Sequence, residues 1–495
     1  MKKILSLILV LLICAPAFLS CAETEETAAE DGTPSVSADS AAEEALPEET
    51  EISRENIPDT LPDDLDFGGE TVTIHVRGGT TDEAYIEEMT GEIVNDTVYE
   101  RNALVCERLN VNIEAFEAEG WETYNNAIAS MRSSIMAADG AFDIIAGWSA
   151  RIPALSLEGL MTDIHSLPHI NLEQPWWNQS SVEELDIAGK LHFVTGDIAK
   201  SLLSAMFLFT FNQKLANDYE LENLYDVVKE YRWTIDYVYN ISSAAYIDVD
   251  GNGQATEADS YGLITSCIND ADSFLQGSHV SMVSRDENGF PILDVNEERM
   301  TTIVEKVYNL FWNNPGCRAH TGGLTERTIF VEGRSLLVTA SLGDLASTFV
   351  EMEDDFGVLP YPMLDESQGK YGTRVQDALS LWCVPIDAKN PAMSAAVLEA
   401  LAAQSYRTVT PAYYDVALKD RYSRDEQTAE MIDLIQSSAL INFEQLYNES
   451  IGNPWFVLRT LMPAKDSNYA SYWAKNSKPI GKMLQKAVEK IQANG

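Results

Sequence analysis

A twelve-residue acidic loop carries the most specific chemical pattern in this sequence. Residues 248–259 read DVDGNGQATEAD, with oxygen-bearing side chains at positions 1, 3 and 5 and a glycine at position 6. That spacing is typical of calcium loops, in which alternating side chains turn inward and the glycine makes the sharp bend. The expected oxygen donors are Asp248, Asp250, Asn252, Gln254, Thr256 and Asp259. We therefore predict a Ca²⁺ site, with a solvated acidic turn as the alternative.

The surroundings of this loop indicate a structural ion. The closing residue is Asp259, where an EF-hand has Glu, and a shorter carboxylate can bind one-sidedly. The flanking residues 242–245 and 261–264 do not form the paired helices of an EF-hand switch. We expect Ca²⁺ to stabilise a loop of the fold and not to act as a signal.

A second set of residues combines aromatic faces with planar polar groups. Aromatic rings offer flat apolar faces to a ligand, and polar side chains can hydrogen-bond its hydroxyls. The candidate ligand contacts of this kind are Gly79, Thr80, Trp148, Ser149 and Arg151. The alternative for Trp148 is a structural role, in which its side chain caps the core of its own part of the fold.

Several of these residues follow predicted strands. Residues 71–76 and 111–116 alternate like strands, and 142–146 read as a buried strand. Helical patterns at 95–108 and 121–138 separate them. This order predicts a parallel sheet covered by helices, with Gly79 and Trp148 at its carboxyl edge.

The first 21 residues read as a targeting segment. Two lysines precede an apolar run that is too short to span a bilayer comfortably, and the run ends in Phe-Leu-Ser-Cys. This resembles a bacterial lipoprotein cleavage site, although Phe18 stands where Leu is usual. We expect Cys21 to become the lipidated N-terminus, with ordinary secretion as the alternative.

Residues 22–59 form a predicted disordered tether. They contain 13 acidic residues and one basic residue, Arg54, and show no apolar periodicity. Such a segment cannot bury enough apolar surface to offset the entropy of ordering, and its charges repel one another. The remaining residues, 60–495, are expected to be globular.

The charge of the chain excludes some classes of partner. Lys and Arg number 33 against 78 Asp and Glu, which gives a formal net charge of -45. Nucleic-acid binding needs clustered basic residues, and none are present, so we predict no nucleic-acid partner. Attachment to an anionic membrane through a basic face is also disfavoured.

Six segments in order resemble one protein family. They are FDIIAGWSARIPALSLEGLMTDI, NLEQPWWNQSSVEELDIAGKLHFVTGD, FLFTFNQKLANDYELENLYDVVKEYRWTIDYV, IFVEGRSLLVTA, FGVLPYPMLDESQGKY and the helical run that begins AMSAAVLEALAAQ. Together they resemble family 1 of the bacterial extracellular solute-binding proteins, the receptors of sugar ABC importers. The resemblance covers nearly all of residues 66–495, and it is specific for the family but not for the ligand.

This resemblance implies an α/β, two-lobed periplasmic-binding-protein fold of type II with an interlobe cleft and discontinuous lobes. Lobe one is expected at about 66–203 and 375–410, and lobe two at about 212–360 and 411–495. The resemblance adds five candidate ligand contacts in the lobe-two cleft loop, near the return crossing and in the C-terminal segment: Ser341, Asp344, Gln376, Asp377 and Trp455. All of the candidate contacts would then line the cleft. The implied function is capture of a carbohydrate, expected to be an oligosaccharide, by hinge closure and its delivery to ABC permease subunits. The protein would be a monomer, held by its lipid at the outer face of the cell membrane.

Enzymatic alternatives find little support in the motifs. The sequence has no HExxH, GxSxG, Walker A or GxGxxG motif, so we expect no enzyme activity. An extracellular glycan hydrolase is the first alternative, because an acidic chain contains many carboxylate pairs. A module that presents its ligand to a membrane sensor is the second. The four cysteines of the body, Cys106, Cys267, Cys317 and Cys383, match no zinc pattern, and disulfides and free thiols both remain open.

Overall fold

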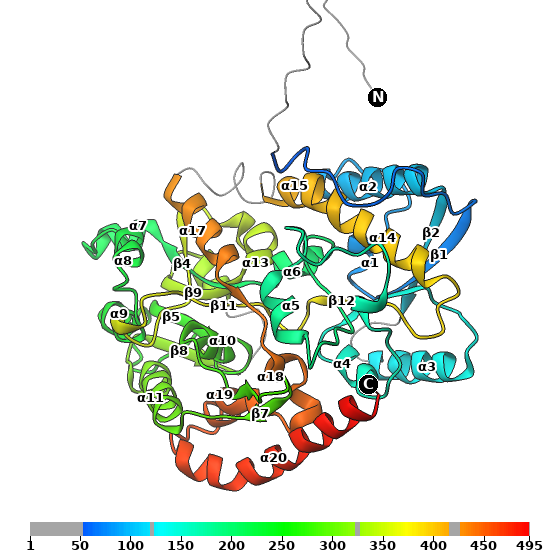
Figure 1. Cartoon of the computed structure of the whole chain (residues 1–495). Helices are drawn as coiled ribbons and strands as arrows, with labels where there is room; N and C mark the ends of the chain where they lie inside the picture. Colours follow the sequence, from blue (N-terminus) through cyan, green and yellow to red (C-terminus); the bar gives the residue numbers. More distant parts are fainter. Residues whose placement is uncertain (1–52, 119–122, 322–326, 415–425, 495) are drawn as a thin grey trace, which may run out of the picture. The chain divides into compact units, whose positions relative to one another are not determined.

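The structure is a computed structural model, and it describes residues 53–118, 123–321, 327–414 and 426–494. All of these residues belong to the second of two compact units, Ile52–Gly495. Two helix-covered β-sheets form two lobes within this unit (Figure 1). Residues 1–52, with Cys21 and most of the predicted tether, lie outside the described residues.

The sheet of lobe one contains the three strands that the sequence predicts, separated along the chain by helices. Its strands run β12-β3-β1-β2 and comprise β1 (Glu70–Arg77), β2 (Val111–Ala118), β3 (Ile144–Trp148) and β12 (Ser380–Cys383). Strand β1 is parallel to both β2 and β3, as the alternation of strands and helices predicts. Val72, Ile74 and Val76 are fully buried on one face of β1 because successive side chains of a strand point to opposite faces. Strand β12 joins antiparallel to β3 from a distant part of the chain.

The helices of lobe one include the two predicted from periodicity. They are α1 (Thr81–Ala84), α2 (Ile93–Leu109), α3 (Tyr124–Ala137), α4 (Ile152–Ser156), α5 (Gln179–Leu185), α6 (Lys200–Ser204), α14 (Pro391–Gln404) and α15 (Thr410–Tyr414). Helix α14 lies against α2, so a late segment completes the lobe (Figure 1).

Lobe two is built on a mixed five-stranded sheet. Its order is β10-β4-β9-β5-β8, with β4 (Phe207–Asn212), β5 (Tyr261–Ser266), β8 (Cys317–His320), β9 (Ser335–Ser341) and β10 (Phe356–Leu359). In β4, Phe207, Phe209 and Phe211 join one buried cluster while Leu208 joins the cluster on the opposite face. Both faces of this sheet are therefore core.

Helices cover this second sheet. They are α7 (Gln213–Asp218), α8 (Leu224–Lys229), α9 (Ile235–Ser243), α10 (Asn269–Gly277), α11 (Glu297–Tyr308), α12 (Thr328–Val331), α13 (Leu342–Ser347) and α17 (Glu426–Ser437). Helix α9 begins after Thr234, whose side chain accepts a hydrogen bond from the Tyr237 N–H, and Asp236 lies in its first turn.

Two crossing segments join the lobes and pair with each other. The first leads from α6 into β4, and the second includes β11 (Thr373–Arg374), which pairs with β13 (Ala439–Leu440). Met206 and Val375 form an antiparallel bridge, and the Gln376 N–H donates to the Ala205 carbonyl at 2.9 Å. These paired backbones are the hinge candidates of the fold.

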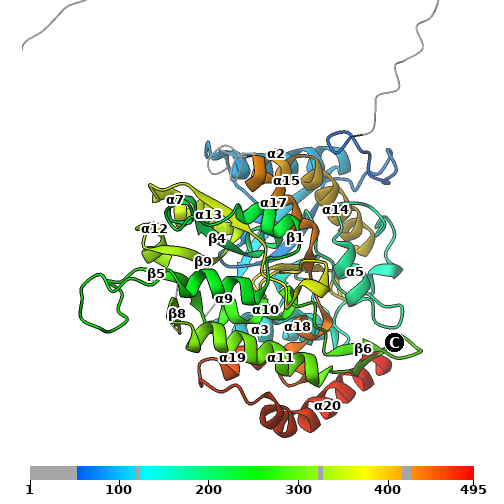
Figure 2. The same cartoon turned by 90° about the vertical axis from the view of Figure 1, so that its left-hand side faces the viewer.

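The C-terminal segment touches both lobes. It contains α18 (Phe443–Leu446), α19 (Val457–Leu461) and α20 (Tyr469–Ala493), beside the hairpin of β6 (Val283–Arg285) and β7 (Pro291–Leu293) (Figures 1 and 2). Early in α20, Trp473 donates to Glu297 of α11 at 3.1 Å. Just beyond α20, Asn494 donates to the Leu157 carbonyl of lobe one at 3.1 Å. Residues 411–495, expected in lobe two, are therefore shared between the lobes, because the long helix spans both.

The end of the predicted tether is packed onto lobe one. Arg54 pairs with Asp197 at 2.8 Å, and its guanidinium lies 4.0 Å from the centre of the Tyr406 ring. Asp59 pairs with Arg108 and with Arg407. Residues from 53 onward are thus part of the folded body.

Substitution of a buried residue in α20 tests its packing role. Leu484 is 3% exposed, so we expect Leu484→Ala to lower the free energy of unfolding by about 2–5 kcal/mol through lost burial and a cavity. The matched control is Lys486→Ala on the exposed face of the same helix. Chemical denaturation of both variants measures the difference. Equal effects would show that α20 is not part of the core.

Candidate functional site

The carboxyl ends of the lobe-one strands meet the second crossing segment. Arg77, the last residue of β1, donates from Nη2 to the Ala378 carbonyl at 2.8 Å. Ser149, just after β3, donates from Oγ to the Asp377 carbonyl at 2.7 Å and from its backbone N–H to Leu379 at 3.1 Å. These contacts bring two predicted site residues, Ser149 and Asp377, together.

Lobe two meets the same segment from the other side. Arg374 donates from Nη1 to the carbonyl of Asn269, the first residue of α10, at 3.0 Å. Gln445 donates from Nε2 to the Val375 carbonyl at 2.5 Å. We call residues 374–379, the ends of β1 and β3, and the start of α10 the interlobe junction.

A row of alternating charges runs through the interlobe junction. Its members, from lobe two to lobe one, are Arg459, Asp272, Arg374, Asp377, Arg77 and Glu83, which we call the charge chain. Arg459 bonds Asp272 at 2.7 Å through Nε, and Arg374 lies 3.7 Å from Asp377. The two ion pairs lie within lobe two and within the crossing segment, and the other neighbours influence one another's pKa through charge at longer range. With three guanidinium and three carboxyl groups, the chain is formally neutral.

Burial shifts the pKa of two of these groups, Asp272 and Arg374. It raises the pKa of Asp272, while the guanidiniums of Arg459 and Arg374 lower it. It also lowers the pKa of Arg374, which Asp272 and Asp377 oppose. Because an unpaired buried charge is costly, each member depends on its neighbours. Asp377 is the most accessible junction carboxyl, with its side chain 19% exposed.

Trp148 and Arg151 lie together after β3. Trp148 is only 6% exposed, packs edge-on against Tyr124, and lies 4.8 Å from the Arg151 guanidinium. Arg151 also pairs with Glu449 of the C-terminal segment. Trp148 is thus mostly enclosed in lobe one, which fits the alternative in which it caps the core of that lobe. Arg151 links the same lobe to residues near Trp455.

The loop after β1 makes fewer contacts with the interlobe junction. Gly79 is exposed, with φ at +85°, a left-handed conformation that favours glycine. Thr80 folds back, donating to the Arg77 carbonyl from its hydroxyl at 3.0 Å. The side chain from this region that reaches the interlobe junction is Arg77. Arg77 was not among the predicted ligand contacts. An Arg at the end of an alternating strand segment is common, and its position alone does not indicate contact with a ligand.

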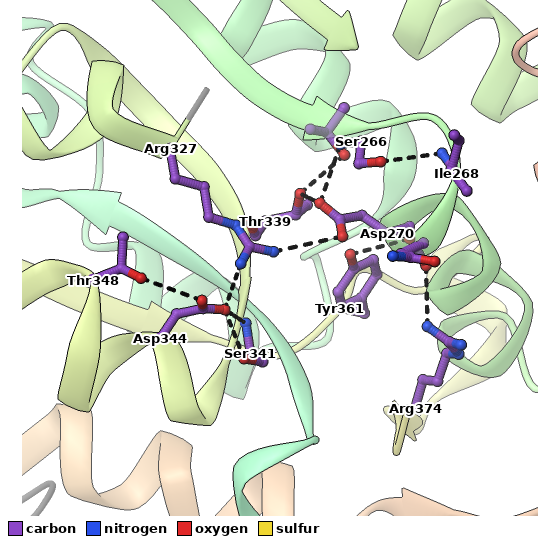
Figure 3. A network of polar contacts seen from close by, with 12 residues as sticks. Ser266, Ile268, Asp270, Arg327, Thr339, Ser341, Asp344, Thr348, Tyr361 and Arg374 are labelled. Carbon is purple, nitrogen blue, oxygen red and sulfur yellow. Dashed lines mark hydrogen bonds and ion pairs between the residues drawn. The ribbon is translucent and has the colours of Figure 1, made fainter. Parts of the chain in front are cut away.

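Ser341 and Asp344 belong to a buried polar network in lobe two (Figure 3). Asp344 Oδ2 accepts bonds from the Ser341 N–H and hydroxyl, both at 2.6 Å, which caps α13. The same oxygen pairs with Arg327 at 2.6 Å, and Arg327 also faces Asp270. With Asp344 6% exposed, these contacts give it a structural role at the carboxyl end of β9.

The two remaining predicted contacts differ in their surroundings. Gln376 is half-buried on the crossing segment, next to Asp377. Trp455 is 1% exposed and belongs to the core of lobe two, and its backbone N–H donates a hydrogen bond to Asn448 Oδ1 at 2.9 Å. Trp455 is therefore placed as a core residue beside the junction.

The acidic loop brings its three aspartates together. One carboxyl oxygen from each of Asp248, Asp250 and Asp259 lies within 4.8 Å of the others. Asp259 is fully buried, and hydrogen bonds from the Thr256 N–H lower its pKa. Asp248 Oδ1 is buried without a hydrogen-bond partner among the described residues. The loop leads into β5 and extends away from it in Figure 2.

Two further observations concern the body as a whole. Cys106, Cys267, Cys317 and Cys383 are free thiols, which agrees with the thiol alternative. Across residues 53–118, 123–321, 327–414 and 426–494, no helix is both long and apolar enough to cross a membrane.

Solved structures share this architecture at low sequence identity. The galacto-N-biose/lacto-N-biose I-binding protein of an ABC transporter from Bifidobacterium longum has a TM-score of 0.54 at 12% identity, covering 86% of this chain and 96% of its own. A cyclo/maltodextrin-binding protein complexed with maltotetraose has a TM-score of 0.52 at 12% identity, covering 86% and 96%. The GacH receptor of Streptomyces glaucescens, studied with acarbose, has 0.51 at 12%, covering 86% and 98%.

This chain has their two-lobed fold. The predicted fold class is therefore confirmed, and these neighbours are binding proteins and not enzymes. No protein-family model and no curated protein sequence matches the chain. In this fold, the interlobe junction lies where loops at the carboxyl ends of strands and the crossing segments meet.

Removing one carboxylate from the charge chain tests its structural cost. In Asp272→Asn, Arg374 and Arg459 lose a buried counter-charge, so we expect the free energy of unfolding to fall by about 3–5 kcal/mol. The matched control, Asp236→Asn, removes a carboxylate whose side chain is 66% exposed beside Lys306 and should cost less than about 1 kcal/mol. Denaturant titrations measure both. A loss no larger than the control's would contradict a coupled chain.

Proposed function

We propose that this protein captures an oligosaccharide between its lobes and delivers it to the permease of an ABC importer. The observation that carries the proposal is the likeness of 86% of the chain to carbohydrate-binding receptors, including one of an ABC transporter. The interlobe junction supports it, because side chains from both lobes reach one crossing segment.

Hinge closure is the proposed mechanism. The two crossing segments pair through Met206 and Val375, so a small backbone rotation there would swing one lobe against the other. Ligand contacts supplied by both lobes exist together only in the closed state. The ligand therefore stabilises closure by its differential affinity for that state.

The charge chain favours an uncharged ligand. Two guanidiniums of the charge chain already have a carboxylate partner, since Arg374 pairs with Asp377 and Arg459 with Asp272. An anionic ligand would have to compete with those carboxylates. A polyhydroxylated neutral ligand can instead donate hydroxyl hydrogens to Asp377 and accept bonds from Arg77, leaving the charge balance intact.

A carbohydrate screen tests this function. We expect neutral oligosaccharides to raise the melting temperature, and Asp377→Asn to weaken the best of them by about tenfold or more, since a hydrogen bond to a charged group contributes about 1.5–3 kcal/mol. Thermal shift finds the ligand and calorimetry measures its affinity. The matched control is Glu366→Gln, an exposed carboxylate on the preceding loop.

Two results would contradict the proposal. If peptides or polyamines shift the melting temperature and saccharides do not, the ligand class is wrong. If Glu366→Gln weakens binding as much as Asp377→Asn, the interlobe junction is not the site.

The proposed cellular setting follows from the N-terminal sequence. Cys21 would carry the lipid, and residues 22–52 would tether the body to the outer face of the membrane. The protein would act as a monomer that docks on the permease subunits. Mass spectrometry of the mature protein identifies a diacylglyceryl modification on Cys21 or its absence.

The alternatives differ in their products and partners. A glycan hydrolase would release new reducing ends from oligosaccharides, which binding alone does not. A sensor module would bind the same ligand but would be encoded next to a sensor kinase and not next to permease subunits.

We also propose that the acidic loop holds a structural Ca²⁺. Three carboxylates within 4.8 Å repel one another without a cation, and Asp248 Oδ1 is buried with no partner in the described part of the chain. Oxygen donors of this kind suit Ca²⁺. The ion would fix the connection between α9 and β5.

Calcium removal tests this site. EDTA should lower the melting temperature and excess Ca²⁺ should restore it, because binding at about a hundredfold over Kd stabilises the native state by about 2.7 kcal/mol. Mg²⁺ should restore it poorly, since it demands a smaller octahedral shell. Asp248→Asn should abolish the response. The control Asp286→Asn, in another acidic turn, should keep it, and indifference of the wild type to EDTA and Ca²⁺ would leave only a solvated turn.

A further inference from the structure

A separate hollow opens on lobe one between the edge strand β2 and helix α3. Its volume is about 350 Å³, and none of its lining residues takes part in the interlobe junction. Strand β2 has a neighbour on one side only, β1, so the sheet ends at this hollow. The space exceeds what one or two ordered waters need.

Aromatic rings form one wall of the hollow. Phe116, Phe142 and His75 are mutual neighbours, with ring centroids 4.9 to 5.6 Å apart. Phe116 is 53% exposed, which is unusual for a Phe on a strand packed beside a helix. An exposed ring face of this kind suits the C–H face of a sugar ring.

His75 supplies a buried polar group with an unused nitrogen. The residue is 2% exposed and lines the hollow, and its Nδ1 has no hydrogen-bond partner among the residues described. Burial lowers the pKa of His75 to about 4, so its ring is neutral at pH 7. A neutral imidazole nitrogen can bond to a hydroxyl in either tautomer, because a hydroxyl both donates and accepts.

Polar side chains complete the rim. Asn126 and Ser130 of α3 line the same hollow, and both are exposed. Glu117 also borders it, but its side chain points to the opposite face of β2 from Phe116, where it accepts a hydrogen bond from the Thr81 hydroxyl. An amide and a hydroxyl beside one aromatic wall can bond hydroxyls of one ring, whereas a purely apolar ligand would leave them unused.

We propose that this hollow binds one neutral pyranose unit, as a second carbohydrate site on lobe one outside the interlobe junction. Phe116 supplies the stacking face, His75 a hydrogen bond at the base, and Asn126 with Ser130 the bonds at the rim. It goes beyond the proposed function and does not depend on it.

Methionine methyl NMR of the full body tests the proposal. Met131 is fully buried in the wall of the hollow, while Met136 on the same helix is 71% exposed and does not line it. Neutral methyl pyranosides should shift the Met131 methyl signal, assigned with Met131→Leu, and leave Met136 unmoved. Phe116→Ala should weaken this response by about tenfold or more, through loss of the ring contact. Its melting temperature should fall only modestly, because Phe116 is 53% exposed and its remaining contacts are with His75 and Phe142.

Matched variants separate this site from the interlobe junction. Met136→Ala and Asp377→Asn should leave the Met131 response intact, whereas Asn126→Leu should reduce it. If no methyl pyranoside moves Met131, or if Phe116→Ala responds like the wild type, the second site does not exist. If Met131 responds in a protein that binds no oligosaccharide between its lobes, the second site stands and the proposed function fails.

Discussion

The charge chain is the interaction on which the arrangement of the two lobes depends. It begins on α19, passes through α10 and the crossing segment, and ends at β1 and α1. Apolar packing between lobes tolerates sliding, but buried ions tolerate little displacement, because separation leaves a charge without its partner. Charge attraction along the chain therefore favours the lobe position that keeps Arg374 near Asp272 and Arg77 near Asp377. The same groups that fix the junction surround the place proposed for the ligand, so ligand binding and lobe position are physically coupled.

Local sequence patterns predicted the elements that form within one stretch of chain. Alternation in 71–76 and 111–116 predicted β1 and β2, and their parallel pairing followed from the helices between them. The C-terminal segment was harder, because α20 has one amphipathic stripe whose partners lie in both lobes. Helical periodicity indicates which face of a helix is buried, but it does not indicate which other elements cover that face. Only the three-dimensional fold shows that Trp473 meets Glu297 while Asn494 meets Leu157.

The candidate site was predictable to the level of loops and not of side chains. The order of strands placed Ser149 and Asp377 at carboxyl ends and crossings, and the structure brings these two together. Nothing in the sequence distinguished Asp377, which is partly accessible, from Asp344, which caps a helix and pairs with Arg327. With 78 acidic and 33 basic residues, a very large number of ion pairs is possible, and pairing depends on distances that sequence spacing does not set. The acidic loop was the exception to this limit on predicting side-chain positions. All of its predicted oxygen donors lie within twelve residues, so their spacing in the sequence keeps them close together.

The route of the chain through the lobes also governs the order in which the protein can fold. Lobe one starts with β1, β2 and β3, yet its sheet is completed by β12 and its helical cover by α14, both made after the whole lobe-two sheet. Pairing between such distant segments must first close a long loop, which slows folding. A nascent chain therefore cannot complete its first lobe until most of its length has been synthesised. For a protein proposed to act at the outer face of the membrane, this delay leaves more time for the chain to cross the membrane before its first lobe is complete.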